Sequence, residues 1–304
     1  MAVSFCGLRL DHPIINASGT FDAIAAQRAF GDALLERFPF AAFVSKTVTL
    51  APRQGNPPPR LWELGAGMIN SIGLPNKGLE GYLAHDLPAL AALPVPLIVN
   101  VMGSSAEDVA TLVRAFGERD EVAALELNVS CPNVKTGLLM GADPGETAAL
   151  LDAVRPCTAK PVVVKLTPNC TSPADVAAAA EAHGADAVSL INTVRGMAMH
   201  PRRPGEPWLG GGTGGVSGPA VRAVALTQVR EVRARVALPI VGMGGVQSGR
   251  HAQDLLDAGA DLVAVGTETF RDPSAGARIA EELANCEDPL SAQHPAHARI
   301  AHER

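Results

Sequence analysis

Residues 161–191 read PVVVKLTPNCTSPADVAAAAEAHGADAVSLI. The segment begins with an apolar, β-branched run at 161–166, continues with an Ala-rich amphipathic stretch at 173–183 and ends with a second apolar run at 187–191. Short apolar runs are typical of strands that a parallel sheet buries on both faces, and the stretch between them has the length of a helix. The segment therefore predicts one unit of strand, helix and strand.

The same pattern recurs on both sides of this segment and predicts an α/β fold. Strands are expected at 14–17, 42–46, 97–101, 123–128, 161–166, 187–191, 238–242 and 262–266. Helices are expected at 106–116, 145–154, 173–183, 219–236, 249–258 and 273–283. Eight strands in a chain of this length indicate a (β/α)8 TIM barrel. A doubly wound sheet fits less well, because no Gly-rich dinucleotide turn follows the first strand.

Nothing in the composition marks a linker, so we expect a single domain over residues 1–304, with a C-terminal tail that frays from about residue 288. Two segments are longer than ordinary loops, at 47–96 and at 192–218. The second is polar and rich in Gly and Pro, and we expect no regular element in it. Long loops inside a compact domain are usually lids or binding loops, so both are expected near a ligand.

Composition excludes several classes of function. The chain has 304 residues, a net charge of −6 and only 4% aromatic residues, which argues against binding of nucleic acid. There is no signal-peptide pattern and no apolar run near the roughly 20 residues that cross a bilayer, so we expect a cytoplasmic protein without membrane contact. Five cysteines, Cys6, Cys131, Cys157, Cys170 and Cys286, lack metal-ligand spacing, so neither a metal site nor a structural disulfide is expected.

Polar residues gather where the predicted strands end, which is the face that carries the active site in TIM barrels. They are Lys46, Asn100, Asn128 with the SCPN segment at 130–133, Lys165, Asn192 and Thr193. One lysine at a strand end is usually a surface charge. Two lysines, three asparagines and a cysteine on one face are harder to explain by chance, because each buried polar group would need a partner.

The seventh and eighth predicted strands end in glycines, as GMGG at 242–245 and VGT at 265–267. Glycines there let backbone N–H groups approach an anion, and the loops after these two strands form the usual phosphate site of TIM barrels. The alternative is that these glycines serve only tight turns. A phosphate site next to a ring of Lys and Asn side chains suggests FMN.

The chain resembles the class 1 dihydroorotate dehydrogenases, the FMN enzymes of pyrimidine synthesis, over almost its whole length. The resemblance rests on NASGTF (16–21), SKTVTLAPRQGNPPPR (45–60), MINSIGLPNKG (68–78), ELNVSCPNVK (126–135), VVKLTPN (163–169), INTVRGMAM (191–199), TGGVSGPA (213–220), GMGG (242–245) and VGT (265–267). Together these ordered segments are very specific. The stretch 200–215 departs from the family pattern in its glycine run and in Trp208.

Within class 1, the segments NTVRGMAM and TGGVSGPA resemble the class 1B catalytic subunit. The resemblance implies oxidation of (S)-dihydroorotate to orotate in de novo UMP synthesis, with electrons passed to NAD⁺ through a partner subunit. FAD and a [2Fe–2S] cluster would lie only in that partner, since the cysteines of this chain lack the spacing for a cluster. A homodimer, and a heterotetramer with the partner subunit, are implied in the same way.

The resemblance also implies roles for individual residues. Cys131 would be the catalytic base. The substrate contacts would be Lys46, Asn70, Ser71, Ile72, Gly73, Leu74, Asn128, Asn192 and Thr193. The FMN contacts would be Ser18, Lys46, Thr47, Asn100, Asn128, Lys165, Ile191, Gly218, Gly244, Gly245, Gly266 and Thr267. A thiol suits a base because its ordinary pKa of about 8.5 lies near neutrality.

Four alternatives remain open at this point. The chain could be a fumarate-using class 1A enzyme, or a dihydropyrimidine dehydrogenase-like flavoenzyme that accepts an uncharged ring. Lys165 alone would also suit a Schiff-base aldolase, but that leaves Cys131 and the glycines at the strand ends unexplained. The last alternative is a flavin-binding barrel without activity, against which the presence of Cys131, Lys46 and Asn128 argues.

Overall fold

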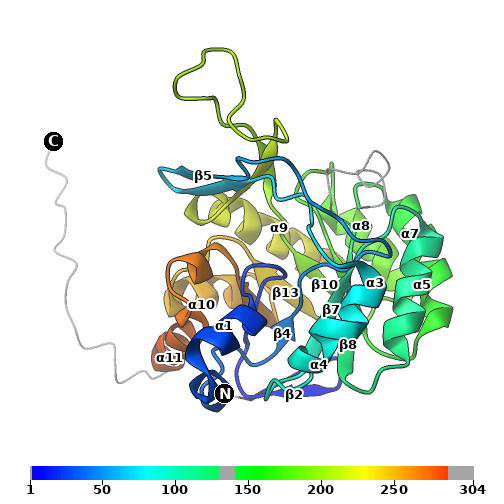
Figure 1. Cartoon of the computed structure of the whole chain (residues 1–304). Coiled ribbons are helices and arrows are strands. Elements are labelled where there is room, and N and C mark those ends of the chain that lie inside the picture. The colour runs from blue at the N-terminus through cyan, green and yellow to red at the C-terminus, as the bar shows by residue number, and fades with distance from the viewer. Residues whose placement is uncertain (1, 130–140, 287–304) are drawn as a thin grey trace, which may run out of the picture.

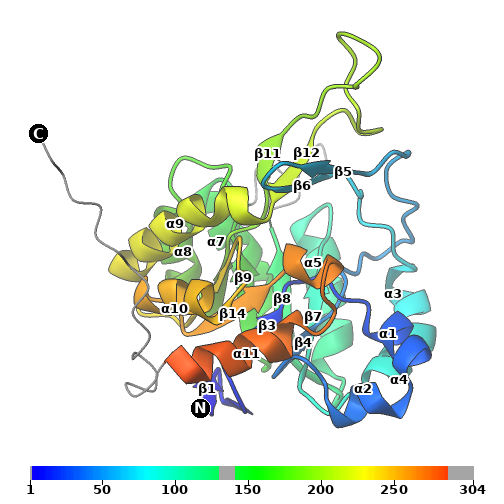
Figure 2. The same ribbon diagram turned by 90° about the vertical axis from the view of Figure 1, so that its left-hand side faces the viewer.

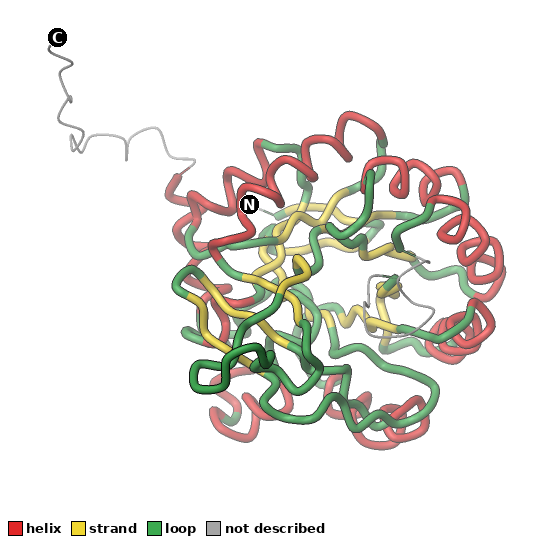
Figure 3. The backbone as a smooth tube through the Cα atoms, turned by 90° about the horizontal axis from the view of Figure 1, so that it is seen from above, coloured by secondary structure: helices red, strands yellow, loops and turns green. Residues whose placement is uncertain are grey.

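The computed structural model describes residues 2–129 and 141–286, and its core is an eight-stranded parallel barrel with helices around it (Figure 1). The barrel strands are β3 (Ile14–Asn16), β4 (Phe43–Val44), β7 (Leu97–Val101), β8 (Val122–Asn128), β9 (Val162–Lys165), β10 (Ala187–Leu190), β13 (Ile240–Met243) and β14 (Leu262–Val265). They lie in the order β3-β14-β13-β10-β9-β8-β7-β4, which the view in Figure 3 shows as a ring. The predicted TIM barrel is confirmed, and every strand end lies within two residues of its expected position.

The outer helices follow the barrel strands. The larger ones are α5 (Ala106–Gly117), α7 (Pro144–Val154), α8 (Pro173–Ala182), α9 (Arg222–Arg235), α10 (Gly249–Asp257) and α11 (Ala275–Cys286). Four of them begin in the same way, with a side-chain oxygen that accepts from the backbone N–H three residues ahead, at Ser105, Asp143, Ser172 and Ser248. Such caps satisfy N–H groups that a helix leaves without an internal partner, and they fix where each helix starts.

Shorter helices fill the connections. They are α1 (Ala23–Phe30), α2 (Asp32–Glu36), α3 (Gly78–Gly81), η1 (Tyr82–Asp86), α4 (Leu87–Leu90), η2 (Arg155–Cys157), η3 (Pro219–Val221) and η4 (Thr267–Phe270). The turn η3 directly precedes α9, so the helix predicted at 219–236 is divided at its first turn.

A side chain joins the first and second barrel strands. Asn16, at the end of β3, is fully buried, and its amide accepts from the Val44 N–H and donates to the Val44 carbonyl, both at 2.8 Å. These two bonds replace backbone hydrogen bonds that the short strands β3 and β4 do not form with each other. The side chain of Asn16 therefore extends the hydrogen bonding of the ring across the gap between β3 and β4.

The barrel interior changes character from one end to the other. A hairpin of β1 (Val3–Phe5) and β2 (Leu8–Leu10) covers the amino-terminal end, where Phe5 and Leu10 pack with the inward apolar side chains Ile98, Ala124, Val163 and Val241. Farther along the same strands, the inward positions are polar. They are Asn100, Glu126, Lys165 and Ser189, all at most 5% exposed. Polarity therefore increases toward the carboxyl ends of the strands.

A second sheet lies over the carboxyl ends of the barrel strands and is called here the roof sheet (Figure 2). Its antiparallel strands are β5 (Leu61–Leu64), β6 (Gly67–Asn70), β11 (Val194–Gly196) and β12 (Gly214–Ser217), in the order β11-β12-β6-β5. The expectation of no regular element in 192–218 was wrong. β11 and β12 are short and rich in glycine, and β12 is held by β6, which comes from the other long segment. No local pattern encodes such a pairing.

Residues 197–208 form an arm that projects from the roof sheet (Figure 1). Trp208 anchors its base, because its ring centroid lies 4.6 Å from that of Trp62 and its Nε1 donates to the Leu61 carbonyl at 3.2 Å. Four of the five glycines between residues 210 and 215 leave no room for a side chain, the exception being Gly212. A Cβ at Gly210 would lie 2.1 Å from the Pro57 carbonyl oxygen, and one at Gly215 would lie 1.9 Å from the Thr193 hydroxyl oxygen.

Candidate active site

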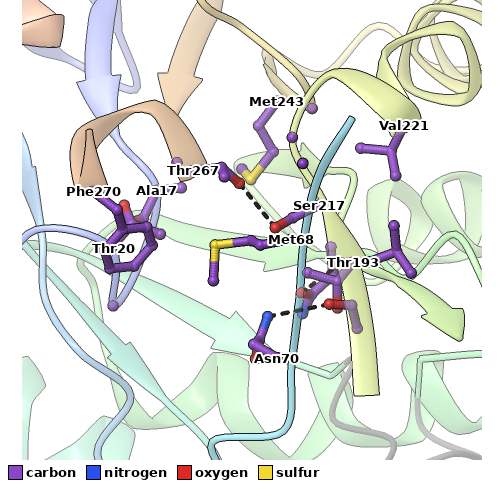
Figure 4. A pocket seen from close by; sticks show the side chains of 18 of the residues that line it. Ala17, Thr20, Met68, Asn70, Thr193, Ser217, Val221, Met243, Thr267 and Phe270 are labelled. Carbon is purple, nitrogen blue, oxygen red and sulfur yellow. Dashed lines mark hydrogen bonds between the residues drawn. The ribbon is translucent and has the colours of Figure 1, made fainter. Parts of the chain in front are cut away.

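A cavity of about 570 Å³ lies between the carboxyl ends of the barrel strands and the roof sheet (Figure 4). Most of the predicted site residues line it. They are Ser18, Lys46, Asn70, Ile72, Gly73, Leu74, Asn128, Lys165, Ile191, Asn192, Thr193, Gly218, Gly244, Gly245, Gly266 and Thr267. The carboxyl ends of seven barrel strands and the roof sheet are thereby brought together. A cavity of this size is typical of a site for a cofactor or a small substrate.

One side of the cavity is a cradle of backbone N–H groups after β13 and β14. The N–H groups of Gly244, Gly245, Gly266 and Thr267 donate to no other described residue. Gly245 has a φ of +71°, and a Cβ there would lie 2.8 Å from the Cβ of Arg222, so only glycine fits without movement. Unpaired N–H groups that face a cavity can bind an anion such as phosphate.

The Thr267 hydroxyl stands beside this cradle. It donates to the Ser217 hydroxyl at 2.8 Å, which joins η4 to the end of β12 (Figure 4). The bond fixes the loop after the eighth barrel strand against the roof sheet.

Lys165 ends β9 inside the barrel and lines the cavity while only 5% exposed. Among the described residues, its ammonium has no hydrogen-bond or ion-pair partner. A buried charge is normally paired, so an unpaired ammonium that faces a cavity indicates a ligand with negative charge or strong acceptors. Lys46, which follows β4, also lines the cavity, and Gly19 leaves room for it: a Cβ at Gly19 would lie 2.8 Å from the Lys46 Nζ.

Amide and hydroxyl groups cover another side of the cavity. Asn128, at the end of β8, donates to the Thr47 hydroxyl at 3.3 Å. Asn192 and Thr193 follow β10, and the Thr193 N–H donates to the Asn192 side chain at 2.8 Å. Asn70, at the end of β6, donates to the Gly215 carbonyl at 3.3 Å, which ties it to the roof sheet. Such groups suit the edges of a planar ring that alternates donors and acceptors.

Three predicted contacts lie behind the cavity lining. Thr47 is 3% exposed and supports Asn128, as described above. Ser71 is 1% exposed and its hydroxyl accepts from Asn56 at 2.9 Å. Asn100 is fully buried and donates to Glu126, while its own side-chain oxygen has no partner. Of the three, Thr47 contacts a lining residue, and the predicted roles of all three as direct contacts remain predictions.

Cys131, the predicted base, lies outside the described residues. Of the other cysteines, Cys6 lies in the hairpin at the opposite end of the barrel, where burial and the nearby Asp186 raise its pKa to about 12. Burial also raises the pKa of Cys170. Both thiols are therefore protonated at neutral pH.

The sequence reasoning missed several residues at the site. Met68 from the roof sheet, Met243 from β13 and Phe270 from η4 add apolar side chains to the cavity lining (Figure 4). Glu126, one inward position before Asn128 on β8, was part of a quoted motif without a role of its own. The signal that could have found it is the alternation along β8, since a residue two positions from Asn128 points the same way.

In the described parts of the chain, no group of His, Cys, Asp and Glu side chains is arranged to hold a metal ion. Likewise, none of the helices in residues 2–129 and 141–286 is long and apolar enough to cross a membrane.

The fold and the site define a TIM barrel in which a cradle of backbone N–H groups and a buried lysine, without partners in the described part of the chain, lie at one cavity. The family model described as dihydroorotate dehydrogenase matches residues 1–286, and the chain belongs to this family. A relative from Bacillus pumilus named "Dihydroorotate dehydrogenase B (NAD(+)), catalytic subunit" is 45% identical over 93% of this chain and 90% of its own. A protein of the same name from Pelobacter propionicus is 44% identical over 93% and 92%. A relative from Solibacter usitatus, 42% identical over 93% and 92%, is provisionally named dihydroorotate dehydrogenase A (fumarate).

Proposed function

We propose that this chain oxidises (S)-dihydroorotate to orotate in pyrimidine synthesis, with FMN in the cavity and NAD⁺ as the final electron acceptor. The observation that carries the proposal is the joint presence, around one cavity, of the N–H cradle and the buried Lys165, neither of which has a partner among the described residues. Membership of the family and the names of the relatives support the substrate.

The residues fit FMN. The phosphate would bind the N–H groups after β13 and β14, with Gly218 and Ser18 beside it. The flavin ring would lie against apolar lining side chains and Lys165. When bound, FMN accepts the hydride and thus two electrons from the substrate. Lys165 would then stabilise the negative charge that the ring gains, because a fixed ammonium in a water-poor site interacts strongly with that charge.

The substrate would lie next to the flavin ring, under the loop that follows β6. Asn128, Asn192 and Thr193 would hold the pyrimidine edges, with further contacts from Asn70, Ser71, Ile72, Gly73 and Leu74. Lys46 would pair with the substrate carboxylate. These contacts orient the substrate so that its C6 hydrogen faces the flavin.

Cys131 would take the proton from C5 of the substrate. It follows Asn128 by three residues in the sequence. The reaction removes a proton from C5 and a hydride from C6, so the base and the flavin must act from different sides. We expect Cys131→Ser to retain FMN and its spectrum while losing most of its rate of flavin reduction at pH 7, because serine is a far weaker base.

The electron acceptor follows from the class 1B resemblance. We propose a partner subunit with FAD and a [2Fe–2S] cluster, in a heterotetramer built on a homodimer, that passes the electrons to NAD⁺. The relatives named as catalytic subunits support this arrangement. The provisionally named relative keeps fumarate as the second candidate.

The test is an anaerobic reduction of the purified chain loaded with FMN. Dihydroorotate should bleach the flavin spectrum, and neither NAD⁺ nor fumarate should then reoxidise it without a partner. Reoxidation by fumarate would move the chain to class 1A. Absence of bleaching by dihydroorotate, together with bleaching by an uncharged dihydropyrimidine, would overturn the substrate.

A further inference from the structure

Glu126 is a buried carboxylate inside the barrel that the proposed chemistry does not use. It lies on β8 and is 4% exposed. Asn100 donates to its Oε2 at 2.5 Å and Ser189 donates to its Oε1 at 2.7 Å. These donors come from β7 and β10, so the carboxylate joins three barrel strands at one level of the interior.

The hydrogen bonds to Glu126 are of the kind that a carboxylate accepts. Each of its oxygens accepts one hydrogen bond, from Asn100 or from Ser189. Glu126 also forms no ion pair with a described residue. A charge in this position affects its surroundings over a longer range than an exposed one, because the interior screens it weakly.

The strand register places this charge directly below the cavity. Asn128 is paired with Lys165 across β8 and β9, and Ser189 is paired with Lys165 across β9 and β10. Glu126 comes two residues before Asn128 on the same strand, which is about 7 Å along it. Side chains at this spacing face the same side of a strand, so Glu126 lies one inward layer below the two lining residues.

We propose that Glu126 is a positioning residue whose buried charge offsets that of Lys165 and lowers the reduction potential of the bound flavin. The inference rests on the proposed function. Reduction adds negative charge to the flavin ring, which Lys165 favours and Glu126 opposes. Ser189 and Asn100 hold the carboxylate in place and disperse its charge.

The test compares holoenzymes at pH 7 by the midpoint potential of their bound FMN. Glu126→Gln keeps the shape and removes the charge, so the equilibrium should shift at least tenfold toward reduced flavin, a rise of about 30 mV for a two-electron couple. Glu231→Gln removes an exposed charge on α9 and should leave the potential unchanged, because water screens that position. The flavin spectrum and the Tm report separately on folding.

If Glu126→Gln does not retain FMN, a second variant tests whether Glu126 lowers the reduction potential of the bound flavin. Ser189→Ala keeps the charge and removes one of its hydrogen bonds, so the potential should fall. An unchanged or lower potential in Glu126→Gln with intact FMN would overturn the inference, as would an unchanged or higher potential in Ser189→Ala. A wild-type chain that binds no FMN would overturn the proposed function and this inference with it.

Discussion

At the amino-terminal end of the barrel, Arg155 and Arg233 are both held by an aspartate and by carbonyls, whereas at the carboxyl end Lys165 faces a cavity without a partner among the described residues. Arg155 donates to Asp186 at 2.8 Å and to the Lys160 carbonyl at 2.9 Å. The charges of Arg155 and Arg233 stabilise the barrel, whereas we expect the charge of Lys165 to pair with a ligand.

The paired arginines belong to an arrangement that occurs twice. Asp186 ends the sequence GAD at 184–186, and Asp261 ends the same sequence at 259–261. Each aspartate accepts from an arginine on a preceding helix and from the first N–H of the neighbouring strand, at Val162 and at Ile240, both at 2.8 Å. Charges at this end are therefore satisfied by the chain itself, as expected for the face that stabilises a TIM barrel.

The largest expected effect is that of Lys165→Met. The substitution keeps most of the side-chain volume and removes the charge. The rate of flavin reduction by dihydroorotate should fall by roughly 100-fold or more, since fixed electrostatic groups at reacting centres have effects of this size. Stopped-flow absorbance checks this. A Tm that falls together with an unchanged reduction rate would show that Lys165 belongs with the structural charges.

Arg155→Met is the matched change at the other end. It removes the bonds to Asp186 and to the carbonyls, and we expect a loss of about 2 kcal/mol in the free energy of unfolding, since charged hydrogen bonds contribute on this scale. Denaturant unfolding measures the loss, and flavin reduction should continue at the wild-type rate. Slow flavin reduction in Arg155→Met, with an unchanged free energy of unfolding, would contradict the assignment of stabilising charges to one end of the barrel and ligand-binding charges to the other.

A smaller effect is expected from Gly245→Ala in the cradle. The added Cβ would lie 2.9 Å from the Gly218 carbonyl oxygen, and the φ of +71° at this position disfavours residues with a side chain. We therefore expect FMN to bind about tenfold more weakly. Gly205→Ala is the control, because Gly205 also has a positive φ, of +83°, but lies in the arm with no atom within 4 Å of an added Cβ. Fluorescence titration should show weaker binding only in Gly245→Ala.

The smallest effect concerns the acid stability of a charged cluster behind the cradle. A hydrogen bond from Ser274 lowers the pKa of Asp272. Burial opposes the shift at Glu282, but hydrogen bonds from Gly249 and Arg278 lower its pKa on balance. Lowered pKa values mean that this stabilisation is complete above about pH 4.5 and is lost as the pH falls through the folded-state values. The Tm of Asp272→Asn should therefore depend less on pH between 3 and 4.5 than that of the wild type, and an equal dependence would contradict this.

The sequence predicted the barrel because each buried strand has its own apolar run, as in 97–101 and 123–128. It also predicted Lys46, Asn128 and Lys165 at the cavity, since strand ends of a barrel meet on one face. The roof sheet could not be predicted in this way. Its strands β11 and β12 carry no apolar alternation, and β12 pairs with β6 from a segment more than 140 residues away.

Side chains that replace backbone pairing or carry charge inside the barrel were also beyond the sequence analysis. Nothing in the NASGTF segment distinguishes Asn16, whose two bonds to Val44 exist only in the folded barrel. Glu126 follows four apolar residues of β8, and its partners Asn100 and Ser189 come from other strands. Such contacts depend on the register between strands, which a single sequence does not contain.

The central claim is that the carboxyl end of the barrel is built for a flavin that carries a phosphate. The most direct measurement is the dissociation constant of the chain for FMN and for riboflavin, which differ only in that group. We expect FMN to bind at least 100-fold more tightly, and the preference to shrink in Gly245→Ala. Equal binding of the two compounds, or binding of neither, would contradict the claim.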